Sequence, residues 1–165
     1  MSADSRAVAN LLLAVAANDS RSLTNLEIQK HIFFCHVWSL IELKRPLVSD
    51  IFEAWRYGPV IPPLYDEFSV FKSDPITALA TKLDPKTGSR IVVPMHEETD
   101  DVGLVNRAYK FYSKLSATGL VELAHEPGGP WHKAWFHSGS VNPGMKISNC
   151  EIAKYYASWG RWKFN

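Results

Sequence analysis

An apolar segment without a clear polar face constrains the fold of this chain more than any other feature. Between Leu26 and Leu43, large apolar side chains fall on several sides of a helical wheel, and Thr24 and Glu27 have the spacing of a capping box. A helix that is apolar on several sides must be surrounded by other elements. We therefore expect this helix at the centre of the core, in a chain whose 165 residues suffice for one domain.

Helical patterns also account for most of the remaining chain, because apolar residues recur at helical spacing behind Ser, Asn or Asp caps. The segment Arg90–Pro94 reads as a short strand ended by proline. The predicted fold is mainly α: a single compact helical domain over residues 1–165, with at most a short minor β-pairing near residues 90–94. The predicted helices are Ser2–Asn18, Leu26–Leu43, a short one from Ser49 to Trp55, Pro63–Phe71, Val102–Leu115, one from Ser116 to His125, and Ile147–Ser158.

The stretch from Phe52 to Phe68, FEAWRYGPVIPPLYDEF, combines aromatic residues with three prolines. A helix interior does not tolerate this pattern, because each proline removes a backbone donor and clashes with the preceding turn. We therefore expect a shaped turn that holds Trp55, Tyr57 and Tyr65 around Gly58-Pro59. Aromatic residues braced in this way serve either as core residues or as interface anchors, and the pattern favours neither.

The charge of the chain is nearly balanced, which limits the partners we expect. Lys and Arg total 18 and Asp and Glu total 17, so no global positive field draws in nucleic acid. The C-terminal SWGRWKFN, residues 158–165, alternates aromatic and basic residues, a pattern that can bind single-stranded nucleic acid. It also suits a tail whose tryptophans dock on the domain or on a partner. We favour docking, and nucleic acid is not the expected partner.

The N-terminal sequence gives no sign of membrane insertion or secretion. Its longest apolar run, Leu11–Ala17, is far shorter than the roughly 20 residues that a membrane span needs. Asp4 beside Arg6 is a poor start for a secretory signal. The two cysteines, Cys35 and Cys150, form no spaced metal or redox motif and suit a reducing compartment. We expect a cytoplasmic protein without a membrane partner.

Six histidines raise the alternative of a small hydrolase or metal protein. His125 and His132 flank a Gly-Gly-Pro turn, and with Glu126 they offer a hydrolytic or metal-binding trio. None of the strong zinc spacings occurs in the sequence, such as a helical H-E-x-x-H. His31 and Cys35, four residues apart on the central helix, are better explained as core side chains. We therefore expect a protein that is not an enzyme, with no catalytic residue, metal or cofactor.

Three segments, in this order along the chain, resemble the Panacea domain, a family that includes SocA-like antitoxins and phage-associated GepA-like proteins. The segments are LEIQKHIFF at 26–34, FEAWRYGPVIPPLY at 52–65 and HEPGGPW at 125–131. The likeness extends over about residues 10–157, and its middle motif is specific. Ala124 departs from the pattern, because the family has a threonine before this histidine. The residues that the resemblance marks as partner-binding or as motif scaffold are Gln29, Lys30, Trp55, Tyr57, Gly58, Pro59, Val60, Tyr65, His125, Pro130 and Trp131.

The resemblance implies an antitoxin of a toxin–antitoxin system, which binds and neutralises a cognate toxin protein encoded beside it. In one branch of the family the antitoxin is an adaptor that presents the toxin to a AAA+ protease. The resemblance specifies neither the toxin nor an oligomeric state. As a physical hypothesis, Trp55 and Tyr57 on one turn pack with Trp131 on the other, and Gly58 and Gly129 allow close backbone approach. Together they would form a rigid surface that holds the toxin.

Overall fold

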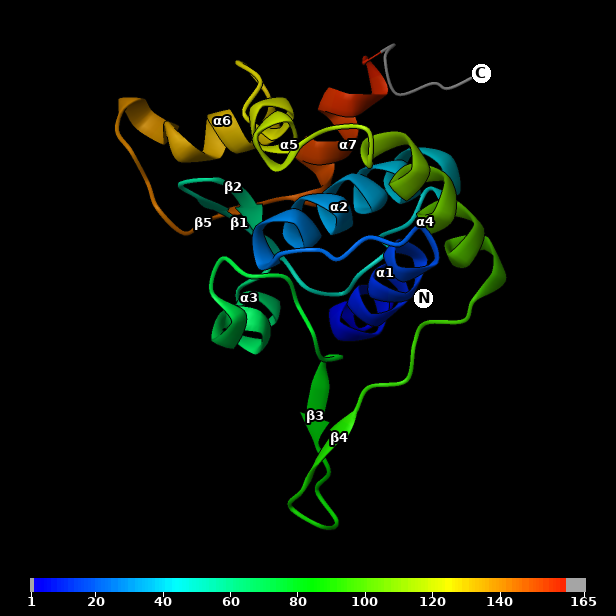
Figure 1. Ribbon diagram of the computed structural model, residues 1–165. Coiled ribbons are helices and arrows are strands. Elements are labelled where there is room, and N and C mark those ends of the chain that lie inside the picture. Colours follow the sequence, from blue (N-terminus) through cyan, green and yellow to red (C-terminus); the bar gives the residue numbers. More distant parts are fainter. Residues whose placement is uncertain (1, 160–165) are drawn as a thin grey trace.

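The computed structural model describes residues 2–159 and is built around one central helix, α2 (Asn25–Trp38). A π-helical turn over Ser39–Leu43 extends it, and each residue from Ile28 to Ser39 is buried. The predicted capping box is confirmed, since the Thr24 hydroxyl accepts from the Glu27 amide and the Glu27 carboxylate accepts from the Thr24 amide. Figure 1 shows other helices on several sides of α2, as a helix without a polar face requires.

The mainly α fold class is confirmed, with seven α-helices among residues 2–159. Helices α1, α4, α5 and α7 all contact α2. Each agrees with a predicted helix to within a few residues; α4 begins earlier than predicted because Glu98 caps it by accepting from the Asp101 amide. Their bounds are α1 Ser5–Asn18, α4 Thr99–Tyr112, α5 Ala117–Ala124 and α7 Asn149–Ala157.

A small antiparallel sheet lies beside α2, and its strand order is β2-β1-β5. The strands are β1 Phe52–Trp55, β2 Gly58–Val60 and β5 Met145–Ile147. The short helix predicted from Ser49 to Trp55 is therefore wrong. Burial alternates along β1, where Phe52 and Ala54 are buried while Glu53 and Trp55 are half-buried. That period of two is the mark of a strand with one core-facing side.

A second antiparallel pair, β3 (Thr81–Leu83) with β4 (Arg90–Val92), confirms the strand predicted near residues 90–94. In Figure 1 this pair projects away from the body of the domain, below α1 and α3. Helix α3 (Pro62–Phe68) carries prolines in its first turn, as predicted, and a 3₁₀ turn over Ser69–Phe71 continues it.

Helix α6 (Pro130–Trp135) was not predicted from the sequence. It follows the turn at residues 125–129 directly. Pro130 stands in its first turn, where backbone amides have no acceptor within the helix, so its missing amide hydrogen costs no hydrogen bond. A 3₁₀ turn over His137–Gly139 comes next. Within residues 2–159, none of the helices is long and apolar enough to cross a membrane.

Aromatic rings from three helices and one strand fill the core on one side of α2. Phe34 stacks on Tyr112 of α4 with ring centroids 4.5 Å apart, and Phe33 contacts Phe52 of β1 edge to face at 5.2 Å. Tyr156 of α7 contacts Phe33 at 6.1 Å. This packing fixes β1 against α2, so the turn that follows β1 starts from a rigid base.

Candidate functional site

The turn between β1 and β2 is a two-residue hairpin with Arg56 and Tyr57 at its tip, because Trp55 pairs with Gly58. Gly58 has φ of +109°, a conformation that side chains with a Cβ rarely adopt. A Cβ atom on Gly58 would also stand 2.6 Å from Cε of Lys30. Glycine is thus required here both by the backbone conformation and by the close approach of α2.

Lys30 of α2 binds this turn from the side of the core. Its side chain is fully buried, and Nζ donates a hydrogen bond to the Pro59 carbonyl at 2.8 Å. Burial lowers the pKa of Lys30 from 10.5 to about 7, because the low-dielectric interior disfavours the charged amine. Lys30 is therefore part of the scaffold and does not face solvent.

Gln29 fixes the backbone just after the end of β2. Its Oε1 accepts from the Ile61 amide at 3.0 Å, and its Nε2 donates to Oδ1 of Asn25 at 3.2 Å. Asn25 in turn donates to the Tyr65 carbonyl at 3.0 Å. Successive polar side chains of α2 thus bind the backbone of β2 and α3, and Pro59 and Val60 are buried between them.

Trp131 joins the second turn region to the first. Its indole Nε1 donates to the Trp55 carbonyl at 2.7 Å, across 76 positions of the sequence. The ring stacks on His125 with centroids 3.7 Å apart, and Pro130 beside it is buried at the start of α6. The two predicted turns therefore meet through a side chain and a backbone carbonyl.

The aromatic rings of the first turn face outward. The Trp55 ring packs on Tyr65 with centroids 5.0 Å apart, and its Nε1 donates to Glu53 at 3.2 Å. Tyr57 is 56% exposed and Tyr65 is 37% exposed. The Arg56 guanidinium lies 5.4 Å from the centroid of the Tyr57 ring. We call Trp55, Arg56, Tyr57 and Tyr65 the aromatic turn surface.

The close approach expected of Gly129 is made to its own turn and to α7. A Cβ atom there would stand 3.0 Å from the Glu126 carbonyl and 3.5 Å from the Tyr155 ring. Gly58 closely approaches Lys30 of α2, and not the second turn as expected. Neither glycine closely approaches the other turn, and Trp131 makes the hydrogen bond between the turns.

The structure does not assemble the trio suggested by His125, His132 and Glu126. His132 Nδ1 accepts from the Gly128 amide at 3.3 Å, and Glu126 accepts from the Tyr155 hydroxyl at 3.0 Å. His125 faces Trp131, and within residues 2–159 its buried Nε2 has no hydrogen-bond partner. Burial and the positive charge of Lys30 lower the pKa of His125.

The described part of the chain holds no group of three His, Cys, Asp or Glu side chains placed to bind a metal. Cys35 is buried and His31 is 1% exposed, so both lie in the core. The tail interpretation of residues 160–165 falls outside the described residues. Trp159, the last described residue, contacts Tyr156 with ring centroids 5.0 Å apart.

Arg56 and Asn25 belong to the site but were missed by sequence reasoning. The alternation of FEAW before RYG would have placed Arg56 at the tip of a hairpin, had that segment been read as a strand. Asn25 gives no such signal, because its partner lies 40 positions away in the sequence.

Comparison with known proteins agrees with the motifs. The family model described as "Antitoxin SocA-like, Panacea domain" matches residues 28–132. The protein named "Antitoxin SocA" from Caulobacter vibrioides (strain NA1000 / CB15N) is 40% identical over 150 residues, a match that covers 91% of this chain and 79% of that protein. No solved structure matches the chain.

Proposed function

We propose that this chain, which belongs to the family of SocA-like antitoxins with a Panacea domain, neutralises a cognate protein toxin by direct contact. An antitoxin role is supported by the family itself. We further propose that residues 1–165 act as one domain in the cytoplasm, and that the toxin is encoded in the neighbouring gene. Neutralisation by binding needs no catalytic step.

The proposed binding site rests on one observation. Exposed aromatic rings project from a turn whose backbone is fixed by three side chains. Lys30 binds the Pro59 carbonyl, Gln29 binds the Ile61 amide and Trp131 binds the Trp55 carbonyl. Anchors held in this way lose little conformational freedom when a partner binds, which favours affinity. Tyrosine, tryptophan and arginine are also the residue types that dominate binding energy at protein interfaces.

Co-expression with the product of the neighbouring gene tests the function. Wild-type antitoxin should restore growth and co-purify with that protein. Tyr57→Ala should weaken the complex at least tenfold by calorimetry, because truncating a central aromatic anchor typically costs about 2 kcal/mol or more. Ile51→Ala is the matched control, since Ile51 is 54% exposed at the other end of the same hairpin.

Circular dichroism separates folding from binding in these variants. If the Tyr57→Ala protein is folded and binds as tightly as the wild type, the aromatic turn surface is not the site that binds the toxin. A wild-type chain that neither rescues growth nor co-purifies would remove the antitoxin function for this pair.

The level of toxin in the cell distinguishes two modes of neutralisation. We propose that masking by direct contact is sufficient, so the toxin should stay abundant while growth is restored. If the chain acts as an adaptor for a AAA+ protease, the half-life of the toxin should instead shorten when the antitoxin is present. A pulse-chase measurement in cells with and without the antitoxin decides between them.

A further inference from the structure

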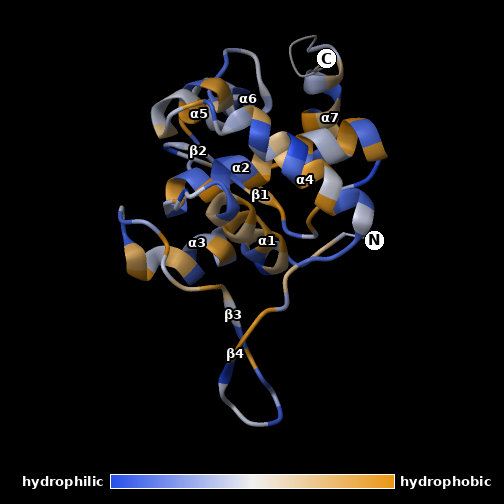
Figure 2. Ribbon diagram, turned by 45° about the vertical axis from the view of Figure 1, so that its right-hand side comes forward, coloured by the Kyte–Doolittle hydropathy of each residue, from blue (hydrophilic) through white to orange (hydrophobic). Residues whose placement is uncertain are grey.

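The β3–β4 pair forms an arm, residues 81–92, that leaves the body of the domain and exposes apolar side chains. Figure 2 shows the arm extending away from all helices, with apolar colouring along β4. Five of the eleven large apolar side chains that are exposed among residues 2–159 lie on the arm or within three residues of it. They are Leu79, Leu83, Ile91, Val92 and Met95. Clustered exposure of this kind marks an interaction site.

The arm is firmly attached at its base. The buried Asn10 side chain of α1 accepts from the Ala80 amide at 2.8 Å and donates to the Val93 carbonyl at 2.8 Å. It also donates to the Ala80 carbonyl at 3.2 Å. These bonds fix the position where both strands leave the body, so the arm is presented in one orientation.

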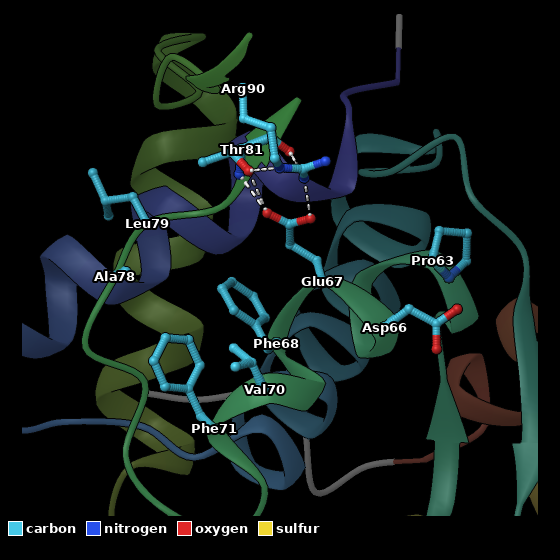
Figure 3. Close-up of a pocket in the computed structure, with 10 residues that line it drawn as sticks. All are labelled: Pro63, Asp66, Glu67, Phe68, Val70, Phe71, Ala78, Leu79, Thr81 and Arg90. Atoms are coloured by element: carbon cyan, nitrogen blue, oxygen red, sulfur yellow. Dashed lines mark hydrogen bonds and ion pairs between the residues drawn. The ribbon is translucent and has the colours of Figure 1, made fainter. Parts of the chain in front are cut away.

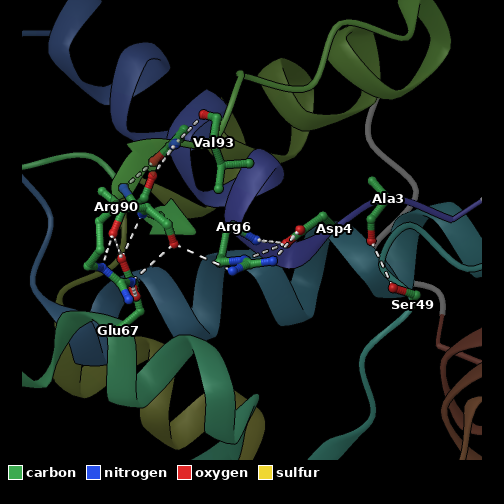
Figure 4. A network of polar contacts seen from close by, with 10 residues as sticks. Ala3, Asp4, Arg6, Ser49, Glu67, Arg90 and Val93 are labelled. Atoms are coloured by element: carbon green, nitrogen blue, oxygen red, sulfur yellow. Dashed lines mark hydrogen bonds and ion pairs between the residues drawn. The ribbon is translucent and has the colours of Figure 1, made fainter. Parts of the chain in front are cut away.

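The outer edge of β3 is closed at Thr81 by side chains from the body. Glu67 of α3 accepts from the Thr81 amide at 2.6 Å and from the Thr81 hydroxyl at 2.9 Å, and it pairs with Arg90 at 2.8 Å. The Thr81 carbonyl accepts from Arg6 at 3.4 Å. Figures 3 and 4 show this network at the junction of α1, α3 and the arm. Such capping hinders strand addition at that end of β3.

The hydrogen-bond pattern of the arm shows which backbone groups of β4 face outward. Hydrogen-bonded pairs alternate with unbonded pairs in an antiparallel ladder. The Val93 amide donates to the Ala80 carbonyl at 3.0 Å, so the next pair, Thr81 with Val92, is unbonded. The amide and carbonyl of Val92 therefore point away from β3, and by the same alternation so do those of Arg90. Within residues 2–159 these four groups have no hydrogen-bond partner.

Each face of the open edge carries an exposed apolar side chain. Ile91, which is 41% exposed, lies on one face of the arm, while Val92 and Leu83, 52% and 60% exposed, lie on the other. On the side of the closed edge, a groove of about 520 Å³ runs between α3 and the base of the arm. Figure 3 shows its apolar lining, with Phe68, Phe71 and Leu79.

We propose that the arm is a second protein-binding surface, on which an extended segment of the toxin adds to the free edge of β4 as a third strand. This inference rests on the proposed function. The backbone of the segment would bond to Arg90 and Val92, and apolar side chains at alternate positions would cover Ile91 on one face and Val92 on the other. The arm carries Lys82, Lys86 and Arg90 against Asp84 alone, so acidic residues should flank the apolar positions of the segment.

A second copy of this chain is a poorer occupant of the edge. Pairing two β4 edges would join strands of only three residues, on arms that hold the bodies apart (Figure 1). Stable protein interfaces bury about 1,200–2,000 Å², far more than two such strands supply. A larger partner can cover both faces of the arm and reach the groove at its base.

Val92→Pro tests the edge directly. Proline at this position removes an outward amide and blocks strand addition, yet breaks no bond to β3. We expect the affinity for the toxin to fall at least about tenfold by calorimetry, while Val92→Thr, which keeps the amide and the β-branched shape, stays within about threefold of wild type. Circular dichroism and urea unfolding of the free variants check that the domain stays folded.

Amide hydrogen exchange gives an independent readout. In the complex, the amides of Arg90 and Val92 should become protected, whereas that of Ile91, which already bonds within the arm, should change little. Unchanged exchange at Arg90 and Val92, or a Val92→Pro variant that binds normally, would overturn the inference and leave the proposed function intact. A dimer of the free chain that Val92→Pro abolishes would also overturn it. If the wild-type chain binds no toxin, the proposed function itself fails.

Discussion

The Cε atom of Lys30 lies 2.6 Å from the position that a Cβ atom would take on Gly58. The central helix and the hairpin turn therefore meet with no space for a side chain between them. Lys30 uses the same contact to donate to the Pro59 carbonyl. This contact is one of the three that fix the aromatic turn surface, and it gives the first two predictions.

Gly58→Ala should destabilise the protein by roughly 3 kcal/mol, because the new methyl group meets a buried side chain and φ is +109°. Gly88→Ala is the matched control: Gly88 also has a positive φ, of +70°, but no atom lies within 4 Å of its Cβ position. It should cost only about 1 kcal/mol. Urea unfolding measures both. Equal losses would show that the contact with Lys30 contributes nothing.

The stability of the wild-type protein should rise as the pH is raised from 7 towards 9. The folded pKa of Lys30 is about 7 and the unfolded value is 10.5, so the unfolded chain binds more protons throughout this range. The gain should reach on the order of 2 kcal/mol by pH 9. Above pH 9 the raised pKa of Cys35 opposes it, because the unfolded thiol then ionises more readily.

Lys30→Met isolates this effect, since methionine is apolar and of similar length. The rise between pH 7 and 9 should disappear in the variant when unfolding is followed by circular dichroism at several pH values. Loss of the bond to Pro59 alone costs about 1–3 kcal/mol. Because only the wild type gains stability as the pH rises, the difference in stability between the two proteins should grow from pH 7 to pH 9. A slope equal to that of the wild type would mean that Lys30 is not the titrating group.

Trp131→Phe should weaken both stability and toxin binding. Phenylalanine can still stack on His125, but it leaves the Trp55 carbonyl without its donor at 2.7 Å. The expected loss of stability is about 1–2 kcal/mol. Trp135→Phe is the control, because the Trp135 indole makes no hydrogen bond within residues 2–159 and should lose little. Thermal unfolding should show a larger loss of stability, and calorimetry a larger loss of affinity for the toxin, in Trp131→Phe than in Trp135→Phe.

Asn10→Ala should release the arm from the body. Removing the side chain leaves the Ala80 amide and the Val93 carbonyl unpaired in a buried position, at a cost of roughly 3 kcal/mol. Trypsin should then cleave the arm faster, at Lys82 or Lys86. Asn106→Ala, which removes one exposed bond to the Val102 carbonyl, should leave the cleavage rate unchanged. Equal cleavage in all three proteins would show that Asn10 does not anchor the arm.

The helices could be predicted from the sequence because their signals are local. The capping box at Thr24 and the apolar residues behind it lie within one helix, so α2 was placed correctly. Strand β1 was missed because it contains only four residues. One of its partners, β5, lies about ninety positions further along the chain, and the other, β2, has only three residues with Pro59 among them. The flanking prolines and Gly58 suggested a turn without showing that a strand precedes it.

The candidate site was only partly predictable for the same reason. The motifs pointed to Lys30, Tyr57 and Trp131, but their roles depend on contacts between distant segments. Lys30 meets Pro59 across 29 positions and Trp131 meets Trp55 across 76. Sequence periodicity does not show that Lys30 is buried while Tyr57 faces outward. The open edge of β4 follows only from the hydrogen-bond alternation of the folded arm.

The attachment of the arm at Asn10 has an evolutionary consequence. Among residues 2–159, the side chains that bond the arm to the body are Asn10, Arg6 and Glu67. Exposed side chains that make none of these bonds, such as Leu83 and Ile91, can therefore be exchanged with little effect on folding. A chain built in this way can diversify its recognition of new targets by drift at the tip, while selection for a stable core acts elsewhere.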